Sequence, residues 1–135
     1  MRRDDKGKLL QYRLDRANES LKAAELLIDN ELLIPAMNRI YYSMFYAVGA
    51  LLVLRDANFS KHGQVKGFFN REFIKTEIFP VKFGKLFNTV FEYRQKYDYV
   101  DLIYPDDEML SDYLSEAQSF IDTVSSFIES NFFNN

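Results

Sequence analysis

Apolar residues recur every three or four positions along almost the whole chain, and this helical period limits the possible folds more than any other feature. The pattern is clearest near the C-terminus, through Leu110, Tyr113, Leu114, Ala117, Phe120, Ile121, Val124, Phe127 and Ile128. No stretch of useful length alternates apolar and polar residues with the two-residue period of a strand. The sequence therefore predicts an all-α protein.

Turn-forming residues divide this pattern into five segments. We expect helices over about residues 8–30, 35–55, 62–76, 83–97 and 107–130, followed by a polar tail over residues 131–135. Asp106, Asp107 and Glu108 are expected to supply a cap and favourable negative charge at the N-terminus of the last helix, where backbone N–H groups are otherwise unpaired. The prediction is an antiparallel bundle of about five helices that forms one domain over residues 1–135.

The chain carries more apolar surface than a small bundle readily encloses. The second predicted helix is apolar around most of its circumference, which is typical of a helix at the centre of a bundle or between two subunits. The 13 Phe and 9 Tyr residues add to this surplus. Because aromatic residues are enriched at interfaces, we expect a homodimer.

The most apolar stretch, Ile40 to Leu54, does not predict a transmembrane helix. Arg39 and Arg55 flank it, and it is shorter than the roughly 20 residues that a membrane span requires. The N-terminus is charged, unlike the apolar core of a secretion signal, and the chain has no Cys. We therefore expect a cytoplasmic protein with no membrane partner.

Charge is unevenly distributed along a chain whose net charge is only -3. Residues 55–85 hold seven Lys/Arg and three Asp/Glu, whereas residues 98–135 hold nine Asp/Glu and no Lys/Arg. This division fits either two solvated surfaces or a basic face that binds a polyanion.

Most motifs of enzyme sites are absent, including Gly-rich phosphate loops, paired metal-binding histidines and Gly-x-Ser-x-Gly elbows. With one histidine and no Cys, the sequence predicts no metal and no cofactor. The histidine, His62, lies at the expected start of the third helix. It fits a surface histidine near a helix end, and the alternative is a general acid or base.

Two polar groups on apolar helices are candidate binding sites. Arg39, Tyr42, Ser43 and Tyr46 share one face of the second helix, where they could line an anion or nucleotide site or simply pair and pack. Tyr93, Arg94, Lys96, Tyr97 and Tyr99 end the fourth helix. Their rings could stack on bases while the cations meet phosphate, although an Arg94–Asp98 pair at i,i+4 would also explain them.

Four segments resemble the small stand-alone HEPN proteins of bacteria and archaea: RIYYSMFYA at 39–47, SKHGQV at 60–65, FNREFIKT at 69–76 and RQKYDY at 94–99. The resemblance extends over essentially the whole chain in the same order. It implies a homodimeric helical bundle, often paired with a small nucleotidyltransferase in a toxin–antitoxin or defence arrangement.

Active members of that family are metal-independent ribonucleases that use Arg, four to six residues, then His. The resemblance assigns catalytic positions to Arg94 and Tyr99, but Tyr99 stands where the motif has His, and Asp101 occupies the position of a modifiable tyrosine. Because tyrosine titrates near pH ~10, it is a poor base. The resulting hypothesis is a HEPN-like protein that binds nucleotide or RNA through Arg39, Tyr42, Tyr46, Arg94 and Tyr97. The alternatives are a degenerate ribonuclease toxin and a non-catalytic interaction bundle.

Overall fold

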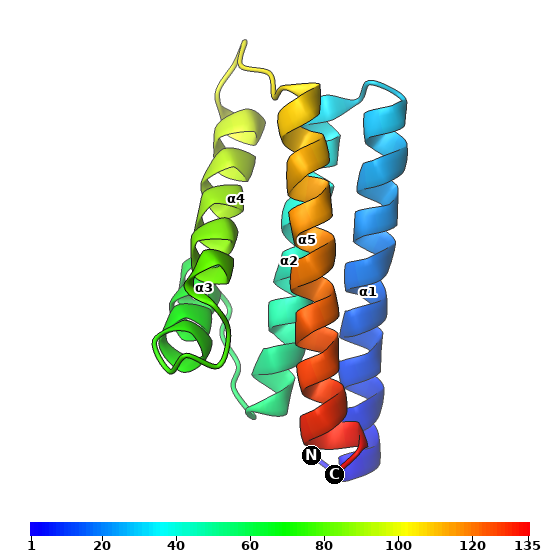
Figure 1. The fold of residues 1–135 in the computed structure, drawn as a ribbon, viewed down its shortest axis with the longest axis vertical. Coiled ribbons are helices and arrows are strands. Elements are labelled where there is room, and N and C mark those ends of the chain that lie inside the picture. Colours follow the sequence, from blue (N-terminus) through cyan, green and yellow to red (C-terminus); the bar gives the residue numbers. More distant parts are fainter.

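The computed structural model describes residues 1–135 and consists of helices joined by short turns (Figure 1). The helices are α1 (Arg3–Asp29), α2 (Leu33–Leu54), α3 (His62–Phe69), α4 (Val81–Tyr99) and α5 (Asp107–Ile128). Single π-helical turns, η1 (Asn70–Ile74) and η2 (Glu129–Phe133), extend α3 and α5. The predicted all-α bundle of five helices is confirmed.

Helix α2 lies at the centre of the bundle and contacts the three other long helices. In Figure 1 it lies behind α5, with α1 on one side and α4 on the other. Thirteen of its residues are buried, as expected for a helix that is apolar on most sides. On α1, Ala17 and Ala24 are fully buried, and their small side chains allow α1 and α2 to approach closely.

The helix ends follow the expected physical chemistry, with one shift. Asp106 caps α5, since its Oδ1 accepts the Glu108 backbone N–H at 2.9 Å. Helix α1 begins at Arg3, earlier than expected, with Asp4 and Asp5 in its first turn. Negative charge there stabilises the partial positive charge of a helix N-terminus, so the charged N-terminal segment is helical.

The third helical segment is interrupted at Asn70, where the structure departs from the prediction of one helix over 62–76. The Asn70 amide donates both to Lys66 O (2.9 Å) and to Asn88 Oδ1 of α4 (3.1 Å). A backbone carbonyl held by a side chain in this way accompanies the change to a π turn. Gly84 lets α4 approach this turn, because a Cβ there would lie 2.7 Å from Asn70 Oδ1.

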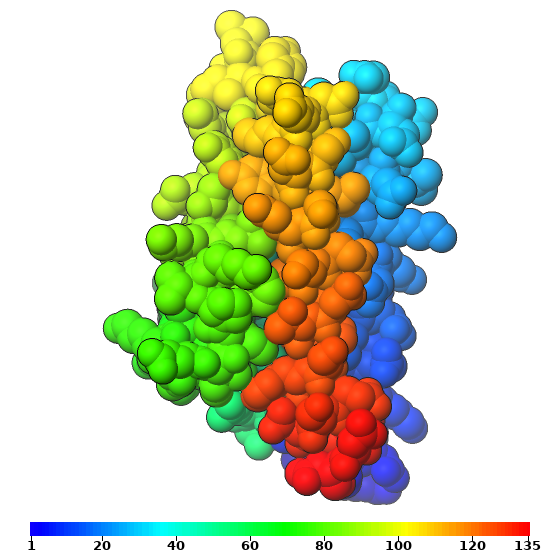
Figure 2. All heavy atoms as spheres, viewed as in Figure 1, coloured from blue at the N-terminus to red at the C-terminus, as the bar shows by residue number.

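The C-terminal segment packs against α1, which corrects the prediction of a fading polar tail. Phe132 is 7% exposed, its carbonyl accepts a hydrogen bond from Arg3 at 2.5 Å, and the Arg3 guanidinium lies 4.2 Å from its ring centroid. Figure 2 shows the two chain ends together, with the α4–α5 loop projecting at the opposite end of the molecule. The segment that closes this end is therefore held by a cation and an aromatic ring.

Most phenylalanine side chains are used within the chain itself. A core of 33 buried residues includes eight of them, and only Phe59 and Phe133 are exposed. The aromatic surplus is thus largely consumed by the core and gives no argument for a second subunit. The homodimer stays a prediction. No helix combines the length and the apolar character needed to cross a bilayer.

Candidate functional site

Arg94 lies on α4 with its guanidinium turned toward α2. Its side chain is 14% exposed, and its Nε lies 3.0 Å from Asp98 Oδ2 one turn later, which confirms the i,i+4 pair expected from the sequence. This contact lacks hydrogen-bond geometry, so Nε remains a buried donor without a directed acceptor. A mostly desolvated guanidinium with unused donors attracts an anionic oxygen strongly.

Tyr42 of α2 is the point at which two arginines meet. The guanidinium carbon of Arg39 lies 4.9 Å from the Tyr42 ring centroid, and that of Arg94 lies 5.5 Å away. Arg94 Nη2 also makes a long, 3.5 Å contact with the Tyr42 hydroxyl. Asn38 links the two cations, because it accepts from Arg39 (2.9 Å) and donates to Asp98 (3.1 Å). Asp98 therefore pairs with Arg94 directly and reaches Arg39 only through the Asn38 amide.

Tyr99 and Tyr46 extend this cluster in opposite directions. Tyr99, the last residue of α4, is 72% exposed, and Arg94 lies 5.8 Å from its ring. Tyr46 lies one turn of α2 beyond Tyr42, with ring centroids 6.2 Å apart, and its hydroxyl accepts from Arg16 of α1 at 3.1 Å. One surface therefore brings together four of the residues predicted to bind nucleotide or RNA, from two separate helices, and Tyr99: Arg39, Tyr42, Tyr46 and Arg94.

Two residues weighed with this group lie elsewhere. Tyr97 stacks on Tyr93 at 5.9 Å, and Tyr93 in turn contacts Tyr113 of α5. Tyr97 therefore faces the α5 side of α4 and makes no contact with Arg94. Ser43 is fully buried, and its hydroxyl donates to the Ile40 carbonyl at 2.6 Å. The position of Ser43 in the helical repeat fits the face of Arg39 and Tyr42, but its short side chain hydrogen-bonds to the helix backbone.

His62 belongs to the cluster, although the sequence favoured a plain surface position for it. Its Nδ1 lies 2.8 Å from the hydroxyl of Tyr41, which is fully buried, and its ring stacks on Phe45 at a centroid separation of 4.2 Å. Arg94 lies 5.5 Å from the same Tyr41 ring. The signal available in the sequence was the HEPN-like SKHGQV segment, but no spacing rule linked it to α2 or α4.

The environment keeps this histidine neutral and this phenol protonated. Burial, and then the positive charge of Arg94, lower the pKa of His62 below its usual 6.5. Its place at the N-terminus of α3 acts in the same direction. Burial raises the pKa of Tyr41, with Arg94 opposing this effect. Since Tyr41 holds Nδ1, Nε2 is the ring atom left to exchange a proton with a ligand.

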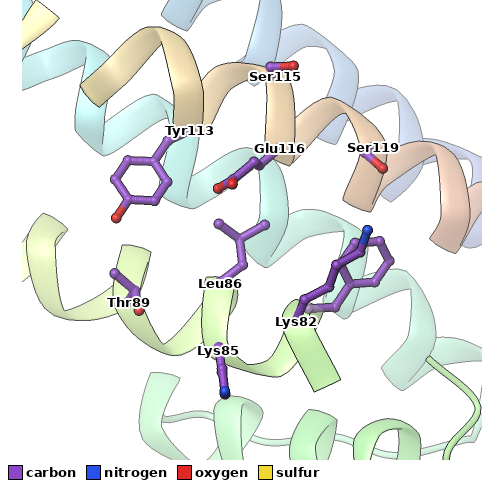
Figure 3. Close-up of a pocket in the computed structure, with 9 residues that line it drawn as sticks. Lys82, Lys85, Leu86, Thr89, Tyr113, Ser115, Glu116 and Ser119 are labelled. Atoms are coloured by element: carbon purple, nitrogen blue, oxygen red, sulfur yellow. The ribbon is translucent and has the colours of Figure 1, made fainter. Parts of the chain in front are cut away.

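A groove lies on the other side of α4, between α4 and α5 (Figure 3). It has a volume of about 450 Å³ and is lined by Lys82, Phe83, Lys85, Leu86, Thr89, Tyr113, Ser115, Glu116 and Ser119. Leu86 and Glu116 point toward each other between the helices in Figure 3. The groove contains two lysines and one carboxylate, Glu116, the same formal charge as the cluster around Tyr42, but it offers flexible ammonium groups in place of planar guanidiniums.

The cluster around Tyr42 and Arg94 is equipped to bind an anion that carries a flat ring. Guanidiniums bind phosphate through paired hydrogen bonds, and exposed tyrosines stack on bases. The single histidine and the acidic side chains form no group of three that could ligate a metal ion.

Known proteins resemble this chain along most of its length. A "UPF0332 protein" from Thermotoga maritima is 42% identical over 126 residues, which cover 93% of this chain and 96% of the relative. Two relatives from Methanocaldococcus jannaschii are named "Putative toxin MJ0142" (42% identical over 90 residues, 67% of this chain and 61% of the relative) and "Putative toxin MJ0605" (30% over 115 residues, 85% of each). The HEPN domain family matches residues 10–129, and the chain belongs to that family.

Proposed function

We propose that this chain is a toxin-like HEPN protein that binds the phosphate of a nucleotide or RNA at the Arg94 cluster. The observation that carries the proposal is that Arg39 and Arg94 both pack on the Tyr42 ring while only Arg94 has a carboxylate partner, Asp98. Each cation is held in place before a ligand arrives, which lowers the entropy lost on binding. Two relatives with toxin in their names support the biological role.

Roles within the site follow from geometry. Arg94 supplies donors to a phosphate oxygen, and Arg39 adds a second positive charge at the Tyr42 ring. Tyr99, which is 72% exposed, offers a ring face for stacking on a base, whereas Tyr46 at the other end is half-buried and holds the Arg16 guanidinium on its ring. Tyr97, which faces α5, has no part in this set. Asp98 aligns Arg94 and leaves when a stronger anion binds.

The proposal includes two partners: a second copy of the chain and a nucleotidyltransferase, with which the protein would form a toxin–antitoxin pair. Both come from the family, whose small members resemble this chain in the segments around Tyr42, His62 and Arg94. A nucleotidyltransferase gene in the adjacent reading frame would support the pairing. Light scattering of the purified protein would test the dimer directly.

Binding is tested with the purified protein, fluorescently labelled single-stranded RNA and AMP at low salt. Loss of a charge-assisted hydrogen bond costs about 1.5–3 kcal/mol, so Arg94→Ala should weaken binding by roughly tenfold to a hundredfold. Arg94→Lys should recover part of the loss by restoring charge without the planar fork. The matched control is Lys85→Ala, which removes an exposed cation from the groove between α4 and α5. Absence of saturable binding to the wild-type protein would overturn the proposal.

His62 gives a specific reason to test a second candidate, a metal-independent ribonuclease. In the tautomer whose Nδ1–H donates to the Tyr41 hydroxyl, Nε2 would take the proton of an RNA 2′-hydroxyl whose oxygen attacks the neighbouring phosphorus. The P–O5′ bond would break, water would protonate the leaving oxygen, and Arg94 would neutralise the added phosphate charge. The histidine absent from the linear motif would thus come from α3.

Cleavage is tested by incubating RNA with the protein in excess EDTA and by expressing the protein in growing cells. Under the ribonuclease hypothesis, His62→Gln abolishes cleavage and growth arrest but leaves RNA affinity within about threefold. Intact RNA and harmless expression of the wild-type protein would exclude the ribonuclease and leave the binding function standing.

A further inference from the structure

A continuous row of cations and tyrosines leads away from the Arg94 cluster along α2 to α1. On α2, positions 39, 42, 46 and 49 share one face by their spacing of three and four residues. At Tyr46 the Arg16 guanidinium lies 5.1 Å from the ring centroid, and at Gly49 the carbonyl accepts from Arg13 at 2.9 Å. We call this row the arginine track: Arg13, Arg16, Arg39, Tyr42, Tyr46 and Arg94.

The cations of the track have little internal compensation. Arg13, Arg16 and Arg39 have no carboxylate within ion-pair distance, although the chain contains 20 Asp and Glu residues. Their donors are directed instead at a carbonyl, a phenol and an amide. Only Arg94 forms an ion pair, with Asp98, and Glu19 adds a weaker favourable charge near Arg16. The row therefore keeps an excess of positive charge on a protein with a net charge of -3.

Arg13 forms the end of the track farthest from Arg94, and it can lie there because Gly49 has no side chain. A Cβ at this position would lie 3.4 Å from Cδ and from Nη1 of Arg13, in direct contact with the arginine. Glycine lets Arg13 lie along α2 with its guanidinium at the Gly49 carbonyl. None of the contacts that define the track involves α5, which covers another side of α2.

Resting on the proposed function, we propose that the arginine track binds an extended single-stranded RNA of several nucleotides, with a terminal phosphate or linkage at Arg94. Positions 39 to 49 span about 15 Å of α2, which corresponds to about four stacked nucleotide steps of ~3.4 Å. Alternating cations and ring faces are the arrangement that holds single strands without sequence preference, because each base can stack and each linkage carries charge. The occupant is thus longer than a mononucleotide.

The test compares AMP with an eight-nucleotide oligouridylate on three proteins: wild type, Arg16→Gln and Lys22→Gln. Both variants lose one cation of α1, but Lys22 lies on the side of α1 that faces α5. We expect Arg16→Gln to weaken octamer binding three- to tenfold and to reduce the slope of log affinity against log salt by about 0.7, while AMP affinity changes less than twofold. Lys22→Gln should leave both ligands within twofold.

Any other result would contradict the proposal that the arginine track binds an extended single strand. Equal losses for Arg16→Gln and Lys22→Gln would show only a general charge effect, and an octamer bound no more tightly than AMP by the wild-type protein would show a mononucleotide site. A dimer that dissociates in Arg16→Gln, measured by light scattering without RNA, would assign the face to a second copy of this chain. Arg94-dependent AMP binding in these cases would preserve the proposed function, whereas no binding of either ligand would remove both.

Discussion

The two sides of α4 differ in chemistry although they belong to one helix. Toward α2, Arg94 meets Arg39 and two tyrosines with a single carboxylate between them. Toward α5, a groove of about 450 Å³ contains Lys82, Lys85 and Glu116 together with small hydroxyl side chains. The comparison teaches that volume alone does not make a binding site. Each side has two cations and one carboxylate, so the difference lies in the planar guanidiniums that pack on a tyrosine ring on the α2 side.

Charge reversal should distinguish the α2 side of α4 from the groove on its α5 side most strongly. Arg39→Glu removes one cation from Tyr42 and adds repulsion, so RNA affinity should fall at least tenfold. Lys82→Glu at the groove makes the same charge change and should alter affinity less than threefold. Fluorescence anisotropy at fixed salt measures both. Equal losses would mean that net charge, rather than the α2 side of α4, governs binding.

Packing around α4 gives the next largest effect. Gly84→Ala would place a Cβ 2.7 Å from Asn70 Oδ1 and 3.1 Å from Ile74, so we expect a loss of about 1–3 kcal/mol in the free energy of unfolding. Gly67→Ala meets nothing within 4 Å in α3 and should be neutral or stabilising by up to ~1 kcal/mol. Urea denaturation compares them. If Gly84→Ala left the free energy of unfolding unchanged, α4 would not pack closely against Asn70 and Ile74.

A tyrosine hydroxyl should matter on the α2 side and not on the α5 side. Tyr41→Phe deletes a buried hydroxyl bonded to His62 and should reduce the free energy of unfolding by about 1 kcal/mol. The hydroxyl of Tyr113 at the groove has no hydrogen-bond partner in the chain, so Tyr113→Phe should change stability by less than ~0.5 kcal/mol. Thermal and urea unfolding measure both variants. Equal losses of stability in Tyr41→Phe and Tyr113→Phe would contradict the expected difference.

The smallest effect is the pH dependence that His62 gives to the α2 side. Because its pKa is lowered in the folded protein, the unfolded chain takes up the proton first as pH falls below 6.5. The free energy of unfolding should therefore be constant with respect to this group above pH 6.5 and decrease below it. As the only histidine, His62 can be followed by NMR. A measured pKa at or above 6.5 would contradict the described environment.

The residue at the source of this shift can be tested with the same titration. Arg94→Gln removes one of the two causes that lower the pKa of His62, so the pKa should move part of the way back toward 6.5. Lys85→Gln should leave it unchanged. A His62 pKa that does not respond to Arg94→Gln would place the imidazole outside the field of the cluster.

Much of the fold could be predicted because each helix carries its own period. The repeat through α5, the Asp106 cap and the apolar circumference of α2 are local features, and all three appear in the structure. The π turn at Asn70 could not be predicted. Its second hydrogen bond goes to Asn88, which lies 18 positions away and reaches Asn70 only after α4 has packed.

The candidate site also has features that could be predicted from the sequence and features that could not. The spacing of Arg39, Tyr42 and Tyr46 placed them on one face, and the i,i+4 spacing of Arg94 and Asp98 predicted their pairing. The sequence grouped Tyr97 with Arg94, yet the two side chains face different helices, since a position in a helix does not say which neighbour covers it. His62 was missed for the converse reason, because its partner Tyr41 is 21 positions away.

By itself, the sequence determined five amphipathic helices, a buried central α2 and the residues that share each helical face, because these depend on a period within one segment. Only the tertiary structure decided that His62 meets Tyr41, that Arg39 and Arg94 share Tyr42, and that Arg16 of α1 extends the row. These contacts join separate helices. Their choice depends on the angle and register at which the whole core packs, which no single helical period encodes.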